Sequence, residues 1–352
     1  MRNFCIIYLY TCVQVASNVL IPVRRCNILL SECSDYPLAS ILVPVYNSPD
    51  VLSTVASVLC QTYKRIELIL IDDGSRQFNR PAVKSYISKY RQPNLESATI
   101  IINPQNMGTV KALKRAFEKA SGCFTFTLAG DDLLYDPDVI KDWIEEFART
   151  GAEVITGRCE NYDAELKEHI GTLPSLSARG ALKRLAGREL FERFALECLV
   201  PGASTAWRTD SLRRYGAFDT PYRLIEDYPL YLRVLRDGGS IHFFDRPVVK
   251  HRGGGVSAEE NNISKLFEED SQNIYKQEIF PYTSFPRRVA RKHNAWERDV
   301  RFDRYYYALR RKYEAKPLIL FAIQVVYYAY HPVRAARELL RLLKKGKNYH
   351  GN

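Results

Sequence analysis

Two aspartate clusters, each placed directly after an apolar run, constrain this sequence more than any other feature. Residues 72–75 (Asp-Asp-Gly-Ser) follow the run 66–71, and residues 130–132 (Gly-Asp-Asp) follow the run 123–128. In an open α/β sheet, the carboxyl ends of the strands border the crevice where ligands bind. Aspartates gathered in such a cleft raise each other's pKa unless a cation is present. Either cluster alone is equally consistent with an Asp-rich turn or helix cap, but together they favour a metal-bound nucleoside diphosphate.

Apolar and amphipathic segments alternate from residue 39 onward, which predicts a parallel sheet covered by helices on both faces. The predicted strands lie at 40–45, 66–71, 98–102, 123–128, 154–156, 203–207, 241–244 and 247–250. Helices are expected after Asp50, around 81–90, from Gly108 to Ala120, from Asp136 to Arg149, at 188–198 and at 226–236. Ser48 is the expected N-cap of the first helix, because Pro49 and Asp50 follow it.

The charge of the chain suggests anionic partners. Its 352 residues carry a net charge of +11, with basic runs at 287–292, 310–312 and 334–347. No nucleic-acid motif accompanies these runs, so we expect a membrane surface rather than DNA or RNA. The G-x-x-x-x-G-K-[ST] and G-x-G-x-x-G patterns are absent, which argues against P-loop enzymes and dinucleotide dehydrogenases. The eight cysteines show no metal-binding spacing, and a reducing cytoplasm is expected.

The two ends of the sequence differ from its middle. Residues 1–37 are predicted to be a leader or a weak anchor, since their apolar run contains several polar residues. The apolar stretch 317–330 is too short to span a bilayer and is expected to be an interfacial or packing helix. We therefore expect a catalytic domain at 38–257 and a helical, basic extension at 258–352.

Five blocks in order resemble the inverting glycosyltransferases of family 2. They are residues 40–47, residues 61–75, the Asn-Met-Gly turn at 106–108, residues 128–132, and Glu226-Asp227 followed by Leu230 and Arg233. The resemblance covers about residues 39–257. It implies a GT-A fold, that is, a Rossmann-like mixed α/β sheet with helices on both faces, here with a helical C-terminal extension.

The resemblance also implies a reaction. A sugar would pass with inversion from a UDP-sugar to a glycan or polyprenyl-linked acceptor, with Mg²⁺ or Mn²⁺ as cofactor. Such an enzyme would work in the cytoplasm, peripherally on the inner face of the membrane and without nucleic acid.

The matched positions receive the family's roles. Asp227 is the expected general base, and Asp131 with help from Asp132 is expected to bind the metal. The expected donor contacts are Pro44, Val45, Tyr46, Asp72, Gly108, Lys111, Arg252 and Ser257. The expected acceptor-side residues are Gly202, Ala203, Trp207 and Glu226.

One position departs from the family pattern. Ala129 stands where the first acid of the D-x-D motif is usual. Metal binding is therefore expected of the remaining acids of the second cluster, Asp131 and Asp132. A non-catalytic nucleotide-sugar-binding protein is therefore the alternative hypothesis.

Overall fold

The computed structural model describes residues 36–218, 221–253, 263–295, 306, 317–330 and 332. By its internal contacts the chain divides after Tyr36, and the fold described below belongs to the unit that begins at Pro37. The predicted leader at 1–37 lies almost wholly outside the described residues, as does the basic stretch 334–347.

The centre of this unit is one mixed sheet. Its described strands are β1 (Ala39–Val45), β2 (Ile66–Asp72), β3 (Leu95–Ile102), β4 (Phe124–Thr127), β5 (Leu133–Leu134), β6 (Val154–Tyr162), β7 (His169–Leu173), β8 (Thr205–Arg208) and β9 (Ile241–Arg252). They follow the order β3-β2-β1-β4-β8-β6-β9-β5, with β7 paired to β6.

The first half of the sheet is parallel, as the alternating sequence predicts. Strand β1 pairs in parallel with β2 and β4, and β2 pairs in parallel with β3. In register, Val45 lies opposite Asp72 and Leu42 opposite Thr127. The acidic clusters that follow β2 and β4 therefore emerge at the same edge of the sheet.

The second half of the sheet is antiparallel at strand β8. Strand β8 runs antiparallel to β4 and β6, while β9 is parallel to β6. The start of β8 and the ends of β6 and β9 consequently lie at the edge where β1, β2 and β4 end. Six strands therefore have one terminus at this edge, and β5 also pairs with the end of β9.

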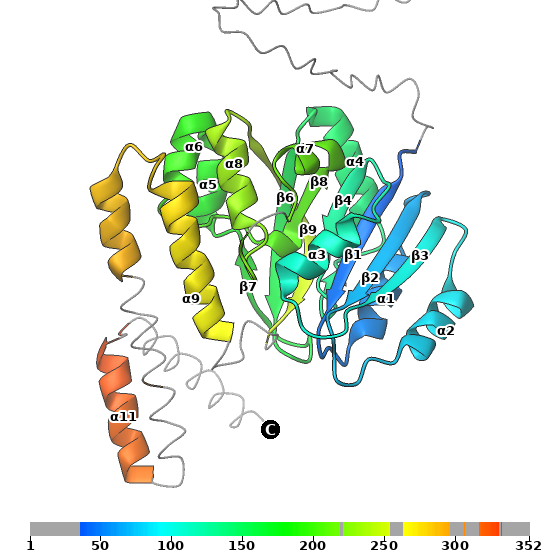
Figure 1. Ribbon diagram of the computed structural model, residues 1–352, viewed down its shortest axis with the longest axis horizontal. Helices are drawn as coiled ribbons and strands as arrows, with labels where there is room; N and C mark the ends of the chain where they lie inside the picture. The colour runs from blue at the N-terminus through cyan, green and yellow to red at the C-terminus, as the bar shows by residue number, and fades with distance from the viewer. Residues whose placement is uncertain are drawn as a thin grey trace, which may run out of the picture. The chain divides into compact units, whose positions relative to one another are not determined.

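Helices cover both faces of the sheet (Figure 1). They are α1 (Val51–Leu59), α2 (Arg80–Tyr90), α3 (Thr109–Phe117), α4 (Val139–Thr150), α5 (Leu176–Arg184), α6 (Gly187–Phe194), the short η1 (Gly202–Ser204), α7 (Thr209–Arg214) and α8 (Tyr228–Arg236). One core packs α1, α2 and α4 on Ile41 and Val43, and the other packs α3 and α5 to α8 on Leu42.

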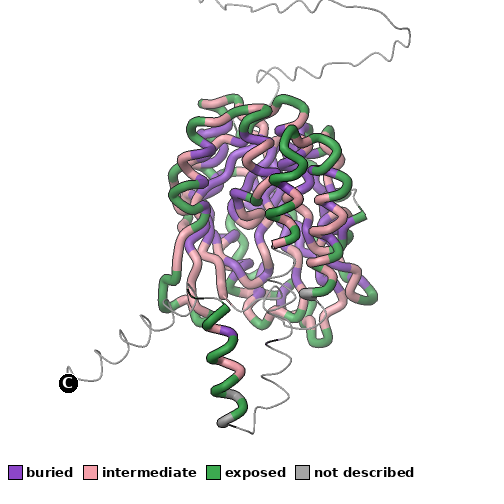
Figure 2. Tube along the Cα trace, turned by 90° about the vertical axis from the view of Figure 1, so that its left-hand side faces the viewer, coloured by how far each residue is buried: buried purple, intermediate pink, exposed green. Residues whose placement is uncertain are grey.

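The split between the two cores follows the period of two along a strand. Figure 2 shows the buried residues gathered in the interior between the exposed outer turns. Together with the strand order, these features confirm the predicted α/β fold class with a mixed sheet and helices on both faces.

Helix α1 starts differently from the prediction. It begins at Val51 with Asp50 as N-cap, and no side chain caps it. The hydroxyl of Ser48 instead donates to the carbonyl of Gly130, at 2.7 Å. The oxygen of Ser48 accepts from the N–H of Asp50 at 3.3 Å, so Ser48 belongs to the turn before the helix and is not its N-cap.

The C-terminal part is helical, as expected. Helix α9 (Ile263–Ile274) continues into η3 (Tyr275–Ile279), and a further helical segment spans residues 286–295. Figure 1 shows α9, in yellow, beside α8. Helix α11 (Pro317–Tyr330) forms over the predicted apolar stretch and exposes Phe321 and Val326. No helix among the described residues combines the length and hydropathy needed to cross a membrane.

Candidate functional site

The first acidic cluster divides into two roles. Both Asp72 and Asp73 are buried. Among the described residues, the carboxylate of Asp72 accepts a hydrogen bond from the backbone N–H of Ser75 alone. Asp73 accepts from Asn103 Nδ2 at 2.7 Å, from Met107 N at 2.9 Å and from Gly108 N at 2.8 Å. Asp73 therefore fixes the 106–108 turn, and Asp72 keeps acceptor capacity at the end of β2.

The second cluster also divides. Asp132 is fully buried and accepts from His251 Nδ1 at 3.0 Å and from Arg252 N at 2.9 Å. Asp131 is partly exposed, and burial followed by the charge of Asp132 raises its pKa. Because the carboxylate of Asp132 is hydrogen-bonded to two residues of strand β9, it positions His251 and Arg252. Asp131 is then the accessible acid of the pair.

Strand β9 brings a histidine and an arginine to this cluster. The hydrogen bond that His251 makes to the carboxylate of Asp132 raises the pKa of His251. Arg252 Nε donates to the carbonyl of Asp131 at 3.0 Å and lies 3.6 Å from a carboxylate oxygen of Asp50. The two predicted ligands of the donor, Arg252 and Asp131, are thus neighbours although 121 residues separate them in sequence.

Asp227 lies at the N-terminus of α8. It is the N-cap of that helix, and its carboxylate accepts from the N–H of Tyr228 at 2.7 Å. The backbone of Gly202 lies against this carboxylate and favours its charged form. Burial raises the pKa of Asp227 to about 6, and burial together with the charge of Asp227 raises the pKa of Glu226.

Gly202 explains how Asp227 and Asp131 share one site. A Cβ at position 202 would lie 2.8 Å from Oδ2 of Asp227, so the absence of a side chain there lets the carboxylate approach. Gly202 directly precedes β8, whose start borders the end of β4 and thus the loop with Asp131. Asp227 and Asp131 therefore lie at the same edge of the sheet, as the predicted mechanism requires.

The Asn-Met-Gly turn contacts the segment before Asp227. Gly108 has a φ of +91°, and a Cβ there would meet the carbonyl and side chain of Arg223 at 2.6 Å. The N–H of Val110 donates to the same carbonyl, at 3.2 Å. Asp73, the turn and the loop before Asp227 thus form one connected assembly.

Sequence reasoning missed Asp270 on α9. Its buried carboxylate accepts three successive backbone N–H groups, those of Arg223 at 2.9 Å, Leu224 at 2.6 Å and Ile225 at 3.1 Å. It therefore holds the loop that delivers Glu226 and Asp227. Its spacing of four residues from Leu266 and Ile274 places it on the buried face of the helix, and that acid within an apolar stripe is the signal that would have found it.

Glu278 in η3 is a second missed residue. It is buried and pairs with two cations of α8, Arg233 and Arg236, the latter at 3.3 Å. The hydroxyl of Tyr222 donates to it at 3.4 Å. Two buried carboxylates of the C-terminal extension therefore fasten it to the segment that carries Asp227.

The other predicted residues differ in how far they are buried. Pro44 and Tyr46 are partly exposed at the end of β1, and Val45 is buried under Gly130. Lys111 is exposed on α3, and Ala203 is partly buried in η1. The ring of Trp207 is buried and stacks on Tyr231 at 5.8 Å, so it is part of the core. Ser257 lies outside the described residues.

The donor set fits a divalent cation held jointly with a substrate. Among the described residues, no group of three His, Cys, Asp or Glu side chains has metal-binding geometry. Mg²⁺ and Mn²⁺ in nucleotide enzymes commonly take one or two carboxylates and complete their shell with phosphate oxygens and water. Asp131, whose charge is disfavoured by burial and by Asp132, is suited to such a cation.

Comparison with known proteins agrees with this geometry. Residues 40–206 match the model of "Glycosyl transferase family 2". An uncharacterized glycosyltransferase of Rickettsia typhi is 26% identical over 233 residues, which is 66% of this chain and 69% of that protein.

Solved structures share the fold. TarS 1–349 of S. aureus aligns with a TM-score of 0.51 and 15% identity over 78% of this chain and 74% of that one. The mannosyltransferase PcManGT from Pyrobaculum calidifontis, in complex with GDP-Man and Mn²⁺, aligns with a TM-score of 0.54 and 17% identity over 85% and 83%.

Residues 40–206 are therefore similar to family 2 glycosyltransferases, and the fold is similar to that of the two solved proteins. The family-model match ends at residue 206, before the Asp227 block and the C-terminal helices. The fastening of that block by Asp270 and Glu278 is therefore a feature of the structure beyond the matched segment.

Proposed function

We propose that this glycosyltransferase transfers a hexosyl or N-acetylhexosaminyl group from a UDP-sugar, with inversion, to a glycan or lipid-linked glycan acceptor. The observation that carries the proposal is the position of Asp227. Its carboxylate packs on Gly202 at the sheet edge that also bears Asp131, and its pKa is raised to about 6. A carboxylate with that pKa is an efficient proton acceptor near neutral pH.

In the reaction, Asp227 accepts the proton of an acceptor hydroxyl. The hydroxyl oxygen forms a bond to the anomeric carbon from the face opposite the diphosphate, while the bond from that carbon to the diphosphate oxygen breaks. The nucleoside diphosphate leaves with the bonding electrons, so inversion follows from a single displacement. The hydrogen bond from the N–H of Tyr228 and the close packing on Gly202 hold the carboxylate in place throughout.

The donor would lie across the ends of β1, β2 and β4. Asp72 has acceptor capacity for the N–H of a uracil ring, and the backbone and ring of Pro44, Val45 and Tyr46 border the same end of β1. Arg252, fixed beside Asp131, would contact the diphosphate. Gly108, Lys111 and Ser257 are proposed to approach the donor as well.

Mg²⁺ or Mn²⁺, when bound, would neutralise charge on the departing diphosphate. Asp131 is the proposed protein ligand. Asp132, predicted alongside it as a ligand, is instead proposed to orient His251 and Arg252.

We further propose that the domain at 38–257 is catalytic and that the extension at 258–352 works at the cytoplasmic face of a membrane. The support is charge and exposed apolar surface. The chain has a net charge of +11, and α11 exposes several large apolar side chains among its described residues. Flotation of the chain with anionic vesicles tests this part, and equal flotation with neutral vesicles would contradict it.

Asp227→Asn separates the enzyme from a non-catalytic binding protein. Asn preserves the N-cap of α8 but accepts no proton. We expect UDP binding to be unchanged and release of UDP from a panel of UDP-sugars to fall by at least about a hundredfold, within the range that general-base loss produces. A parent chain that binds UDP yet releases none from any donor, with any acceptor offered, would favour the non-catalytic alternative.

A further inference from the structure

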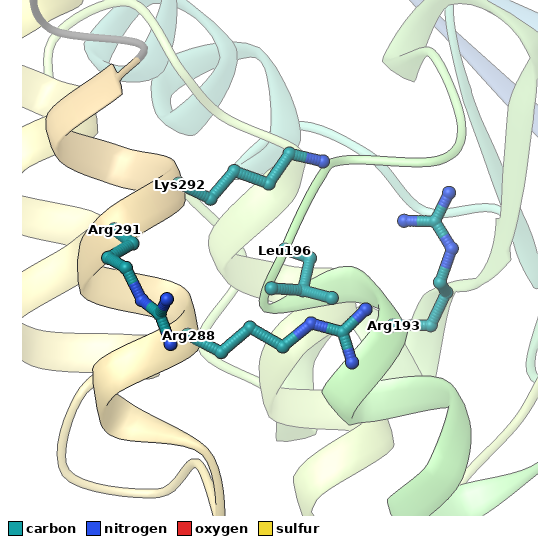
Figure 3. A pocket seen from close by; sticks show the side chains of 5 residues that line it. All are labelled: Arg193, Leu196, Arg288, Arg291 and Lys292. Atoms are coloured by element: carbon teal, nitrogen blue, oxygen red, sulfur yellow. The ribbon is translucent and has the colours of Figure 1, made fainter.

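Two adjoining cavities lie next to Asp227, where the end of α6 meets the C-terminal helices. The first has a volume of about 610 Å³ and includes Asp227 and Tyr228 in its wall. The second has a volume of about 800 Å³ and is lined by Arg193, Leu196, Arg288, Arg291 and Lys292 (Figure 3). Leu196 and Lys292 line both cavities, so the two are adjacent.

The first cavity has a mainly apolar and aromatic wall. Phe267 is half exposed in it, and the rings of Tyr275 and His293 stack at 4.2 Å with nearly parallel planes. Sites of this volume, with an apolar wall and a few polar groups, are typical of small-molecule binding. The carboxylate of Asp227 is one of those polar groups, so a sugar bound here would present a hydroxyl to the proposed base.

The second cavity is cationic. Figure 3 shows Arg288 and Lys292 extending from the helical segment 286–295 across the space toward Leu196. Glu197 pairs with both Lys292 and Arg193 at 3.2 Å. Within the described part of the chain, Arg288 and Arg291 have no carboxylate at ion-pair distance. Four cations therefore share one acid, which leaves an excess of positive charge facing the cavity.

We infer that the acceptor is a saccharide that carries a phosphoryl group. This inference rests on the proposed function, since it assigns the acceptor of the same base. The sugar occupies the first cavity with its reacting hydroxyl at Asp227, and the phosphoryl oxygens lie among Arg288, Arg291 and Lys292. Guanidinium groups offer paired N–H donors that match phosphate oxygens, whereas a neutral glycan would leave these cations without a partner.

The acceptor's phosphoryl group takes no part in the bonds that change. The hydroxyl proton passes to Asp227, the new glycosidic bond forms, and the phosphoryl ester remains intact. A lipid diphosphate and a soluble sugar phosphate present the same chemistry to the cationic cavity. The lipid adds an apolar chain, and this difference separates the two sources.

The test compares three forms of each acceptor sugar with the full chain: the neutral octyl glycoside, the octyl diphosphate-linked sugar and the sugar 1-phosphate. We expect a lower KM for the two phosphorylated forms, and in Arg288→Gln/Arg291→Gln a rise of about tenfold in that KM with kcat unchanged. The KM of the neutral glycoside should not change. Arg287→Gln is the matched control, because Arg287 is exposed on the same helical segment but does not line the cavity.

Calorimetry measures the affinity for the same three acceptor forms independently of turnover. Saturating UDP and Mn²⁺ keep the donor site filled during the titration. Equal affinity for the neutral and phosphorylated forms would overturn the inference, as would equal effects of Arg287→Gln and the double variant. A lower KM for the octyl diphosphate than for the 1-phosphate identifies a lipid source, and equal values identify a soluble one. Transfer to all three forms without preference would contradict this inference alone. Absence of UDP release with every donor would contradict the proposed function.

Discussion

Asp270→Asn tests whether the C-terminal extension positions the catalytic base. The carboxylate of Asp270 receives the N–H groups of Arg223, Leu224 and Ile225, directly before Glu226 and Asp227. Asn is close in size but has one acceptor oxygen, and its amide group would face an N–H donor. At least one charge-assisted hydrogen bond is therefore lost and another group is left unsatisfied.

The magnitude follows from these contacts. A hydrogen bond to a charged group contributes about 1.5–3 kcal/mol, and an unsatisfied buried donor costs about 1–3 kcal/mol. We expect the free energy of unfolding of Asp270→Asn to fall by about 2–4 kcal/mol, measured by urea denaturation. A displacement of the Asp227 loop by about 1 Å should lower kcat by about a hundredfold.

The assay measures kcat from UDP release and measures UDP affinity separately, at a temperature where the variant is folded. UDP affinity should fall less than kcat, because the 223–225 loop leads directly into Asp227 but reaches the donor side through its contacts with Gly108 and Val110. Glu269→Gln is the control, since Glu269 is exposed on the same helix and forms only a surface pair with Lys265 at 3.8 Å. It should change stability by less than about 0.5 kcal/mol. A folded Asp270→Asn with the kcat of the parent, or with the same loss as Glu269→Gln, would refute the positioning role.

Four further predictions concern the site. Because the pKa of Asp227 is about 6, kcat/KM should rise with pH through about 6, and a rate that is flat between about pH 5 and 8 would exclude Asp227 as the base. The raised pKa also means that the folded state binds more protons than the unfolded state between about pH 4 and 6, so stability falls as pH rises through that window. Asp227→Asn should therefore be more stable than the parent by about 1–3 kcal/mol at pH 7.5 and equal to it near pH 4, and thermal melts that show the reverse order would contradict the burial argument. Gly202→Ala would bring a Cβ within 2.8 Å of Oδ2 of Asp227, so kcat should fall by about 10-fold to 100-fold with UDP affinity retained; an unchanged kcat would show that the close approach is dispensable. Gly108→Ala adds a side chain at a φ of +91° against the backbone of Arg223, so its melting temperature should fall by several degrees, and a melt equal to that of the parent would mean that the turn adapts.

Local patterns were sufficient for much of the fold. The strands β1, β2 and β4 lie where apolar runs of strand length predicted them, because burial on both faces requires continuous apolar residues. The two acidic clusters follow β2 and β4 in the sequence itself, and parallel pairing then requires them to share an edge. The same logic failed at Ser48, where the helix begins at Val51 and the hydroxyl joins the preceding turn to Gly130, which is distant in sequence.

The roles of individual acids needed the tertiary structure. Asp131 and Asp132 are adjacent and chemically identical in the sequence, and only the arrival of β9 commits Asp132 to His251 and Arg252. Asp72 and Asp73 are separated in the same way by the 106–108 turn. Neighbouring side chains point in different directions, and the partner that each one meets comes from a remote segment.

The sequence by itself determined where the first strands lie along the chain and which acids follow them, since these depend on residue type and short spacing. Only the tertiary structure decided that α9 fastens the Asp227 loop through Asp270 and that α6 and residues 286–295 enclose a cationic cavity. The physical reason is that hydrogen bonds and charge clusters between segments depend on distances in space, which the separation of those segments along the chain does not encode.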